Sequence, residues 1–400
     1  MVKINPIFNQ EKLAMKRFTA IILAMVLILS LTATSAFAAT SSTADDYEAQ
    51  AKKIMNGMTL REKVGQLFMV SPDAIQNGGS SITKLTPEMK KKLTKYNLGG
   101  VIMFDRHIKT PSQIKKFNKA LTNASYDDLG IPIFIAVDEE GGRVTRIAHN
   151  SNFDVPKFKS MLAIGNTGKT SKAKNVGMKI GAYLKEYGFT LDLAPVADCF
   201  TNPKNTVIGD RSFGADPDLV KKMVASTIKG FHEQGIMTAI KHFPGHGNTS
   251  EDTHKQTVKV TKSWAKLKKL ELVPFVYNFE NTDMIMASHI RCTGVDSNIA
   301  PASLSNIMIN KKLRSELGYK GIVTTDSLDM AAVSSKYDSA TAAVKSFRAG
   351  CDILLCPVNF VNAYNGVLNA VKDGTISEKR LNKSVLRIIK LKLKYADESN

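Results

Sequence analysis

Eight short, continuous apolar runs are the feature of this sequence that most restricts its fold. Longer lysine-rich stretches, in which apolar residues recur at helical spacing, separate them. Apolar runs without polar alternation are typical of parallel strands that are buried on both faces of a sheet. The runs are residues 65–70, 98–104, 131–137, 189–197, 236–243, 283–289, 321–327 and 351–356. Eight strands that are each followed by a helix predict an α/β fold that closes as a (β/α)8 TIM barrel, with an open doubly wound sheet as the alternative.

The stretches between the runs carry the helical spacing most clearly at residues 172–187, 218–234 and 303–316. A last helix over 377–395 is expected to close the same domain. No repeat and no second domain is evident in the sequence.

Polar side chains stand at the C-terminal ends of several runs. In a barrel, these ends and the loops that follow them build the active site. We therefore expect one shared site that contains the following six residues: Asp138, Asp198, Lys241, His242, His289 and Asp326.

The first 38 residues have the layout of a secretory signal peptide. A basic start at Met15-Lys16-Arg17 precedes an apolar run over 18–31, and Ala36-Phe37-Ala38 supplies a small-residue cleavage site. The apolar run is short for a membrane span, which needs roughly 20 residues. We predict a signal peptide over 1–38, with Met15 as an alternative start, and a catalytic barrel domain over 39–400. A retained membrane anchor is the alternative.

The charge of the chain favours an anionic partner. Lys and Arg number 55 against 36 Asp and Glu, a formal net charge of +19. Residues 1–38 hold four basic and one acidic side chains, a net of +3, so the exported chain keeps +16. Export and the lack of a recognition motif argue against nucleic acid as the partner and for an anionic cell-wall or membrane surface. We expect a secreted, cell-wall-associated monomer, and we expect its four cysteines to be buried free thiols.

The sequence KHFPGHG at residues 241–247 is rich in histidine and raises the question of a metal site. Pro244-Gly245 interrupts the spacing between His242 and His246, so the two imidazoles cannot share one helical ligand face. We therefore predict neither a metal nor another cofactor.

Proton transfer is the alternative use of the same region. Lys241 and His242 can donate hydrogen bonds, and Asp252 can orient His254 from two positions away. A carboxylate beside an imidazole favours the imidazolium, which is a general acid that works near neutral pH. A polar loop without chemistry stays open as the other interpretation.

Asp326 follows the seventh apolar run directly and is the candidate nucleophile. A carboxylate at a barrel strand end, opposite Lys and His from another strand, suits attack on a developing cation. Asp329 competes for this role, although it is better placed to cap the following helix.

Two further motifs predict sugar binding. Asp138 can accept bonds from sugar hydroxyls, and the glycines at 141 and 142 would let the backbone approach a ligand closely. Arg211 could clamp a carbonyl or carboxylate group.

Taken together, these motifs resemble glycoside hydrolase family 3, and within it the single-domain β-N-acetylglucosaminidases (NagZ-type enzymes). The sequence departs from the usual motifs at Glu139, where Gln is commoner, and at Thr253, where Ser is usual. The matching segments run in order through the chain and are residues 137–146, 191–198, 210–217, 241–247 with 252–254, 286–290 and 313–330.

The resemblance implies a TIM barrel and a retaining mechanism. Asp326 matches the nucleophile, and His254 matches the general acid/base with Asp252 as its partner. The positions that match sugar-binding residues are Asp138, Arg211, Lys241 and His242.

We therefore expect an exported exo-β-N-acetylglucosaminidase (β-hexosaminidase) that acts on peptidoglycan-derived saccharides. The only tryptophan, Trp264, lies away from the strand ends, which predicts a short pocket, because long glycan clefts stack sugars on aromatic side chains. Three alternatives stay open: another sugar preference within the family, phosphorolysis instead of hydrolysis, and a non-catalytic basic protein that binds the cell wall.

Overall fold

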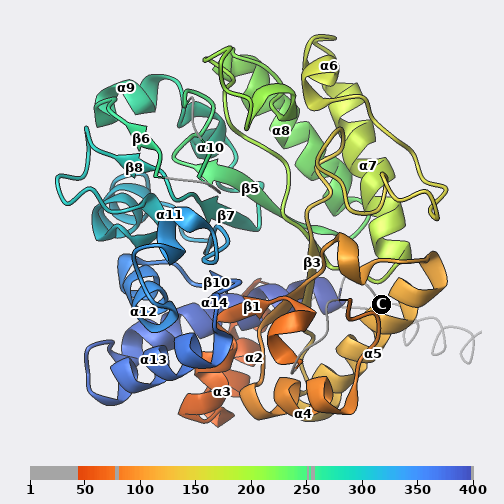
Figure 1. Ribbon diagram of the computed structural model, residues 1–400, viewed down its shortest axis with the longest axis vertical. Helices are drawn as coiled ribbons and strands as arrows, with labels where there is room; N and C mark the ends of the chain where they lie inside the picture. The colour runs from red at the N-terminus through yellow and green to blue at the C-terminus, as the bar shows by residue number, and fades with distance from the viewer. Residues whose placement is uncertain (1–43, 77–80, 250–251, 254–256, 398–400) are drawn as a thin grey trace, which may run out of the picture. The chain divides into compact units, whose positions relative to one another are not determined.

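Eight parallel strands form one sheet that closes on itself (Figure 1). Along the sheet their order is β10-β1-β2-β3-β4-β5-β7-β9. A parallel bridge between Thr324 and Ile353 joins the two ends, and the Thr325 N–H donates to the Ile353 carbonyl at 3.0 Å. The strands are β1 (Phe68–Val70), β2 (Gly100–Ile102), β3 (Phe134–Val137), β4 (Leu191–Asp192), β5 (Met237–Phe243), β7 (Met284–Ala287), β9 (Ile322–Thr325) and β10 (Leu354–Leu355).

The predicted barrel is therefore confirmed, and the open doubly wound sheet is wrong. Each of the eight apolar runs contains one barrel strand. The sequence did not predict a second, two-stranded parallel sheet outside the barrel, which β6 (Lys259–Val260) and β8 (Arg291–Cys292) form.

This computed structural model describes residues 44–76, 81–249, 252–253 and 257–397. The predicted signal peptide and His254 lie outside the described residues. The chain divides into two units, and the second, Tyr47–Asn400, holds the whole barrel. No helix in the described ranges is long and apolar enough to cross a bilayer.

Helices surround the barrel strands (Figure 1). The predicted helices at 172–187, 218–234 and 377–395 correspond to α7, α8 and α14, whereas the stretch at 303–316 is divided into a 3-10 turn and a π-type helix, η5. The helices are α2 (Ala44–Gly57), α3 (Leu60–Gly65), η1 (Pro72–Ile75), α4 (Pro87–Tyr96), η2 (Asp105–His107), α5 (Pro111–Leu129), α6 (Met161–Gly165), α7 (Thr170–Glu186), η3 (Gly209–Arg211), α8 (Pro217–His232), α9 (Trp264–Lys269), α10 (Val273–Tyr277), η4 (Ala302–Leu304), η5 (Ile307–Glu316), α11 (Ala331–Ser334), α12 (Ser339–Ala349), α13 (Phe360–Lys372) and α14 (Glu378–Asp397).

Local sequence signals account for the helix ends, as α5 illustrates. The Thr110 hydroxyl accepts a hydrogen bond from the Gln113 N–H at 3.2 Å, and Pro111 occupies the first turn, where no N–H is needed. The helix ends at Gly130, whose φ of 65° suits a residue without a Cβ atom.

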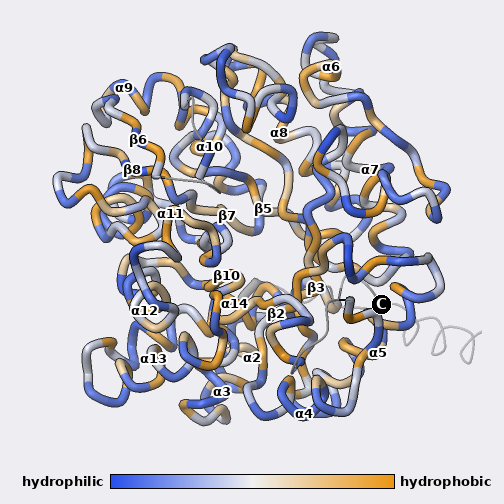
Figure 2. The backbone as a smooth tube through the Cα atoms, viewed as in Figure 1, coloured by the Kyte–Doolittle hydropathy of each residue, from blue (hydrophilic) through white to orange (hydrophobic). Residues whose placement is uncertain are grey.

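The core lies in and around the barrel. All residues of the eight strands are buried, and Figure 2 shows hydrophobic residues gathered along the central strands. The four cysteines are buried free thiols, as predicted. Trp264 packs in α9, where its indole N–H donates to Glu316 at 2.7 Å.

Helix α14 covers the N-terminal end of the barrel. The Lys392 ammonium donates to the Gln66 side chain, just before β1, at 2.8 Å. The Tyr395 hydroxyl donates to the Asp283 carboxylate, just before β7, at 3.0 Å. Closure of this end leaves the C-terminal ends of the strands for the functional site.

Candidate active site

A cavity of about 190 Å³ lies at the C-terminal ends of the strands. Seven of the eight barrel strands, or the loops that follow them, contribute to its wall. The lining residues are Ile102, Phe104, Asp138, Glu140, Val144, Arg146, Leu193, Val207, Ile208, Arg211, Lys241, His242, His246, Thr253, Met286, Asp326, Ser327 and Leu355.

Most of the predicted site residues meet in this cavity. The predicted nucleophile and the four predicted sugar-binding residues all line it: Asp326, Asp138, Arg211, Lys241 and His242. Trp264 does not line the cavity, as its position in the sequence predicts.

The predicted Asp252–His254 pair is only partly described. Asp252 is half-buried and is not among the lining residues, whereas Thr253 is buried and lines the cavity. His254 lies outside the described residues. The assignment of the acid/base therefore stays a prediction from the sequence.

Lys241 and His242 both face the cavity although they are consecutive residues of β5. In a regular strand, neighbouring side chains point to opposite faces. The register of β5 against β7 shifts between Ile240 and Phe243, which breaks this alternation. The irregularity thus brings a lysine and a histidine to the same cavity.

Lys241 lies between two carboxylates. Its Nζ atom is 2.7 Å from Asp138 Oδ1 and 2.7 Å from Glu140 Oε1. Burial lowers the pKa of Lys241, but the charges of Asp138 and Glu140 outweigh burial and raise it above its ordinary value. Lys241 is therefore a fixed cation in the cavity wall.

Arg211 forms a two-bonded ion pair with Glu140. Its Nε and Nη2 atoms donate to the two carboxylate oxygens at 2.8 and 2.7 Å. Burial would raise the pKa of Glu140, yet the charges of Arg211 and Lys241 hold it well below the ordinary range. The carboxylate that Arg211 clamps thus belongs to the protein itself.

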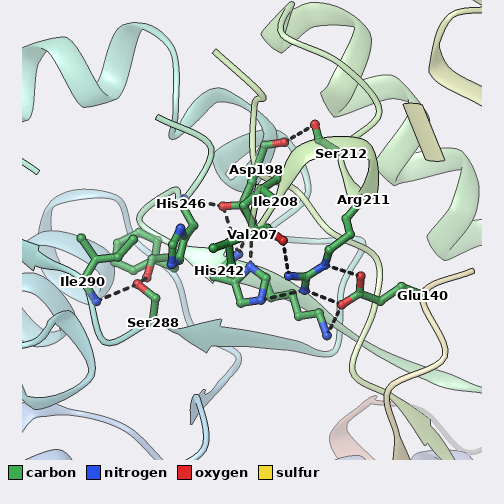
Figure 3. Close-up of polar contacts among 12 residues, drawn as sticks. Glu140, Asp198, Val207, Ile208, Arg211, Ser212, His242, His246, Ser288 and Ile290 are labelled. Carbon is green, nitrogen blue, oxygen red and sulfur yellow. Dashed lines mark hydrogen bonds and ion pairs between the residues drawn. The ribbon is translucent and has the colours of Figure 1, made fainter. Parts of the chain in front are cut away.

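His242 is held between an acceptor and a donor (Figure 3). Its Nδ1 atom lies 2.7 Å from Asp198 Oδ2, and its Nε2 atom lies 3.3 Å from Arg211 Nη2. Because Arg211 can only donate, Nε2 accepts and Nδ1 carries the proton that is donated to Asp198. These two contacts fix the orientation of the His242 imidazole in the cavity wall.

Asp198 lies behind the cavity and not in its wall, unlike the prediction. It accepts from the backbone N–H of His246 at 2.6 Å as well as from His242. Burial opposes its ionisation, but the interactions with His242 and His246 outweigh it, and the pKa of Asp198 lies below its ordinary value. Burial lowers the pKa of His246 itself to about 4, so its imidazole is neutral at ordinary pH.

Asp326 is positioned by the end of β9. Its backbone N–H donates to the Ala287 carbonyl at 2.8 Å, and its Oδ1 atom accepts from the Ser327 N–H at 2.8 Å. His289 does not line the cavity, unlike the prediction, because its Nε2 atom bonds to the Ser327 carbonyl at 2.8 Å from behind. His289 thereby supports the turn that carries Asp326.

The structure separates Asp326 from its competitor Asp329. Asp329 is exposed, does not line the cavity and accepts from the Ser327 hydroxyl at 2.7 Å. The prediction that it caps the next helix is wrong, since Met330 is the N-cap of α11 and no side chain caps it.

Gly141 and Gly142 have a different purpose from the predicted one. They form a turn with φ of 84° and 67°, and a Cβ atom on Gly142 would lie 3.1 Å from the Ser160 backbone. Neither glycine lines the cavity. They serve the turn and its packing, not close approach to a ligand.

Three ionisable residues of the cavity wall were not predicted as site residues from the sequence: Glu140, Arg146 and His246. Glu140 was detectable, because it is two residues after Asp138 and side chains at that spacing share a face in extended backbone. Arg146 places its guanidinium 3.8 Å from the Asp138 carboxylate. Its Nε atom is buried and finds no acceptor within the described part of the chain.

The described residues contain no group of three or more His, Cys, Asp or Glu side chains that could hold a metal ion. The polar groups of the cavity instead pair with one another, and they combine fixed cations with carboxylates. Such a wall can bind hydroxyl and amide groups and can stabilise charge that develops in a reaction.

Comparisons with known proteins identify the family of this chain. The family model described as "Glycosyl hydrolase family 3 N terminal domain" matches residues 59–391. A β-hexosaminidase A of Pseudoalteromonas piscicida is 32% identical over 345 residues, which cover 80% of this chain and 57% of the relative. A β-hexosaminidase of Tolumonas auensis is 34% identical over 295 residues, which cover 73% of this chain and 83% of the relative.

A solved structure shares the fold. The glycoside hydrolase family 3 β-N-acetylglucosaminidase from Paenibacillus sp. strain FPU-7 superposes with a TM-score of 0.79 at 35% identity. The match covers 86% of this chain and 64% of that one, so this chain spans less than two thirds of the Paenibacillus and Pseudoalteromonas proteins. The match of the family model over most of the chain shows that this protein belongs to glycosyl hydrolase family 3.

Proposed function

We propose that the protein is an exported, retaining exo-β-N-acetylhexosaminidase that removes terminal N-acetylglucosamine from peptidoglycan fragments. One observation carries the proposal: Asp326 lines the same small cavity as the Asp138–Lys241–Glu140–Arg211 network. A carboxylate nucleophile opposite a wall of sugar-binding groups is the arrangement that a retaining glycosidase needs.

In the proposed first step, Asp326 attacks the anomeric carbon while His254, as imidazolium, protonates the leaving oxygen. The glycosidic bond breaks and a glycosyl ester forms on Asp326. In the second step, neutral His254 takes a proton from water, which attacks the anomeric carbon and releases Asp326. The place of Thr253 in the cavity wall supports this role, because His254 is the next residue and Asp252 the previous one.

The size of the cavity supports exo action. About 190 Å³ is below the usual range for drug-sized ligands, roughly 300–1,000 Å³, and fits one sugar ring better than an extended glycan. The names of the relatives support N-acetylhexosamine as that sugar. The N-terminal sequence pattern supports export, and the charge of +16 after residue 38 supports attraction to an anionic cell wall.

Turnover of aryl glycosides tests the proposal. The wild type should hydrolyse aryl N-acetylglucosaminide much faster than aryl glucoside. Asp326→Ala should lower kcat by at least about 10³-fold, whereas the matched Asp329→Ala should keep near wild-type activity. Equal losses in the two variants would refute the nucleophile assignment.

Three further measurements test the acid/base assignment, the reaction type and export. His254→Ala should lower kcat/KM roughly 10²–10⁴-fold with a poor leaving group and much less with a highly acidic phenol, because kcat/KM reports the first step and only the poor leaving group needs protonation there. Sugar 1-phosphate formed in added phosphate would identify a phosphorylase instead of a hydrolase. For export, the mature N-terminus should begin near Ala39, and an intact N-terminus would contradict cleavage.

A further inference from the structure

Glu139 is a fully buried carboxylate directly behind the cavity, with an exposed fraction of 0%. Its Oε2 atom accepts from the backbone N–H groups of Arg146 and Ile147 at 2.5 and 2.9 Å. Its Oε1 atom accepts from the Ala148 N–H at 2.9 Å and from the Tyr183 hydroxyl at 2.8 Å. All four donors therefore meet on a single side chain.

Three of these donors belong to the segment that carries Arg146 to the cavity. Arg146 lines the cavity, its guanidinium is 3.8 Å from Asp138, and its Nε atom lacks an acceptor among the described residues. The backbone N–H of Arg146 is bonded to Glu139, so the backbone position of Arg146 depends on that carboxylate.

The side chain of Glu139 points to the opposite side of the backbone from those of Asp138 and Glu140. Asp138 and Glu140 both bond to Lys241 in the cavity wall, whereas the Glu139 side chain points away from it. The Glu139 N–H donates to the buried Asp192 carboxylate at 3.0 Å, and Tyr183 comes from α7. Glu139 is thus held through both its backbone N–H and its side chain, as a residue that positions a binding residue must be.

We infer that Glu139 is a positioning residue for substrate binding, which acts by holding Arg146 in place for contact with the sugar. The inference rests on the proposed function, because the ligand of Arg146 is the sugar named there. Glu139 touches no cavity space and takes no part in bond breaking. Its loss should therefore raise KM more than it lowers kcat.

A carboxylate suits this place better than an amide. Glutamine has one oxygen, so it can accept from the Arg146 and Ile147 N–H groups while its NH₂ group donates to the Tyr183 oxygen. The Ala148 N–H would then face an NH₂ group and lose its acceptor. Glu139→Gln should accordingly fall between the wild type and Glu139→Ala.

A double-mutant cycle on KM tests the inference, with aryl N-acetylglucosaminide as the substrate. Glu139→Ala should raise KM by about 10-fold, which corresponds to about 1.4 kcal/mol, and change kcat by less than about 3-fold. In an Arg146→Ala background, the same change should raise KM by less than about 2-fold, because its target is gone. Glu139→Gln should raise KM by about 3-fold alone and have no effect in that background.

The controls separate positioning from general destabilisation. Asp296 is another buried carboxylate, 2% exposed, which accepts from the Asn298 N–H at 2.9 Å and does not line the cavity. Asp296→Ala should lower the thermal midpoint without changing KM. If Glu139→Ala does not fold, the double-mutant cycle of Glu139→Gln with Arg146→Ala tests the inference by itself.

Equal effects on KM in the wild-type and Arg146→Ala backgrounds would overturn the inference, as would an unchanged KM in Glu139→Ala. If the wild type turns over only the glucoside, the sugar assignment fails and the same cycle on the glucoside decides for Glu139. A wild type inactive on both substrates would overturn the proposed function and this inference together.

Discussion

Replacement of Lys392 by methionine should remove a pH dependence of folding stability that this lysine creates. Lys392 is 1% exposed and lies in α14 at the N-terminal end of the barrel. Its ammonium donates to Gln66 Oε1 at 2.8 Å and lies 4.9 Å from the centre of the Phe134 ring. Among the described residues it has no carboxylate partner, and burial lowers its pKa to about 7.

The sign and size of the effect follow from this pKa. The unfolded chain keeps a lysine pKa of about 10.5, so between pH 7 and 10.5 it binds more protons than the folded chain. The free energy of unfolding therefore rises with pH in this window, by about 1.4 kcal/mol per pH unit and by about 5 kcal/mol in total. The advantage is absent below pH 7, where Lys392 is charged in both states.

Chemical denaturation of the wild type and Lys392→Met at pH 7, 8 and 9 measures this slope. The stability of the wild type relative to the variant should increase by about 2 kcal/mol between pH 7 and 9. Loss of the donor to Gln66 costs the variant about 1–3 kcal/mol at every pH and leaves the slope unchanged. Lys390→Met is the matched control, since Lys390 is partly exposed and pairs with Glu48 at 3.2 Å. Parallel curves for the wild type and Lys392→Met would refute the reasoning.

Three further predictions concern the charged networks. Arg211→Ala should destabilise the fold by about 3 kcal/mol and raise KM. The reason is that it leaves the buried Glu140 with Lys241 as its only cation among the described residues. An unchanged denaturation curve and an unchanged KM would contradict this prediction. Asp198→Asn should lower kcat/KM by about 10–100-fold, because it loses a charge-assisted hydrogen bond to His242. A kcat/KM equal to that of the wild type would show that Asp198 does not support His242 in this way. Burial opposes ionisation of Asp352, but three arginines lower its pKa from 3.8 to about 2, so the ionised group contributes about 2 kcal/mol of folding stability above pH 5. This stability is lost as the pH falls to 2, and acid titration of Asp352→Asn should lack the loss.

The barrel could be predicted from the sequence because strands that are buried on both faces appear as continuous apolar runs. A strand such as β3 must be apolar at every position, so the run at 131–137 identifies it without reference to the rest of the chain. The strand ends then locate the site, and Asp138 and Asp326 were found in this way.

Contacts between residues far apart in the sequence leave no comparable pattern from which they could be predicted. Glu140 and Arg211 are 71 residues apart in sequence, and nothing in either motif indicates that they neutralise each other. The register shift that turns both Lys241 and His242 to the cavity depends on pairing with β7. His289 has the residue type and position of a site residue, yet its bonds to Ser303 and Ser327 place it behind the wall.

Trapping of the covalent intermediate tests the central claim most directly. A fluorinated N-acetylglucosaminyl donor with a good leaving group should add one sugar to the intact protein, and peptide mapping should place the ester on Asp326. The Asp326→Ala variant should take up no label, and Asp329→Ala should label like the wild type. An ester on another residue, or inversion at the anomeric carbon during turnover of the natural sugar, would contradict the account.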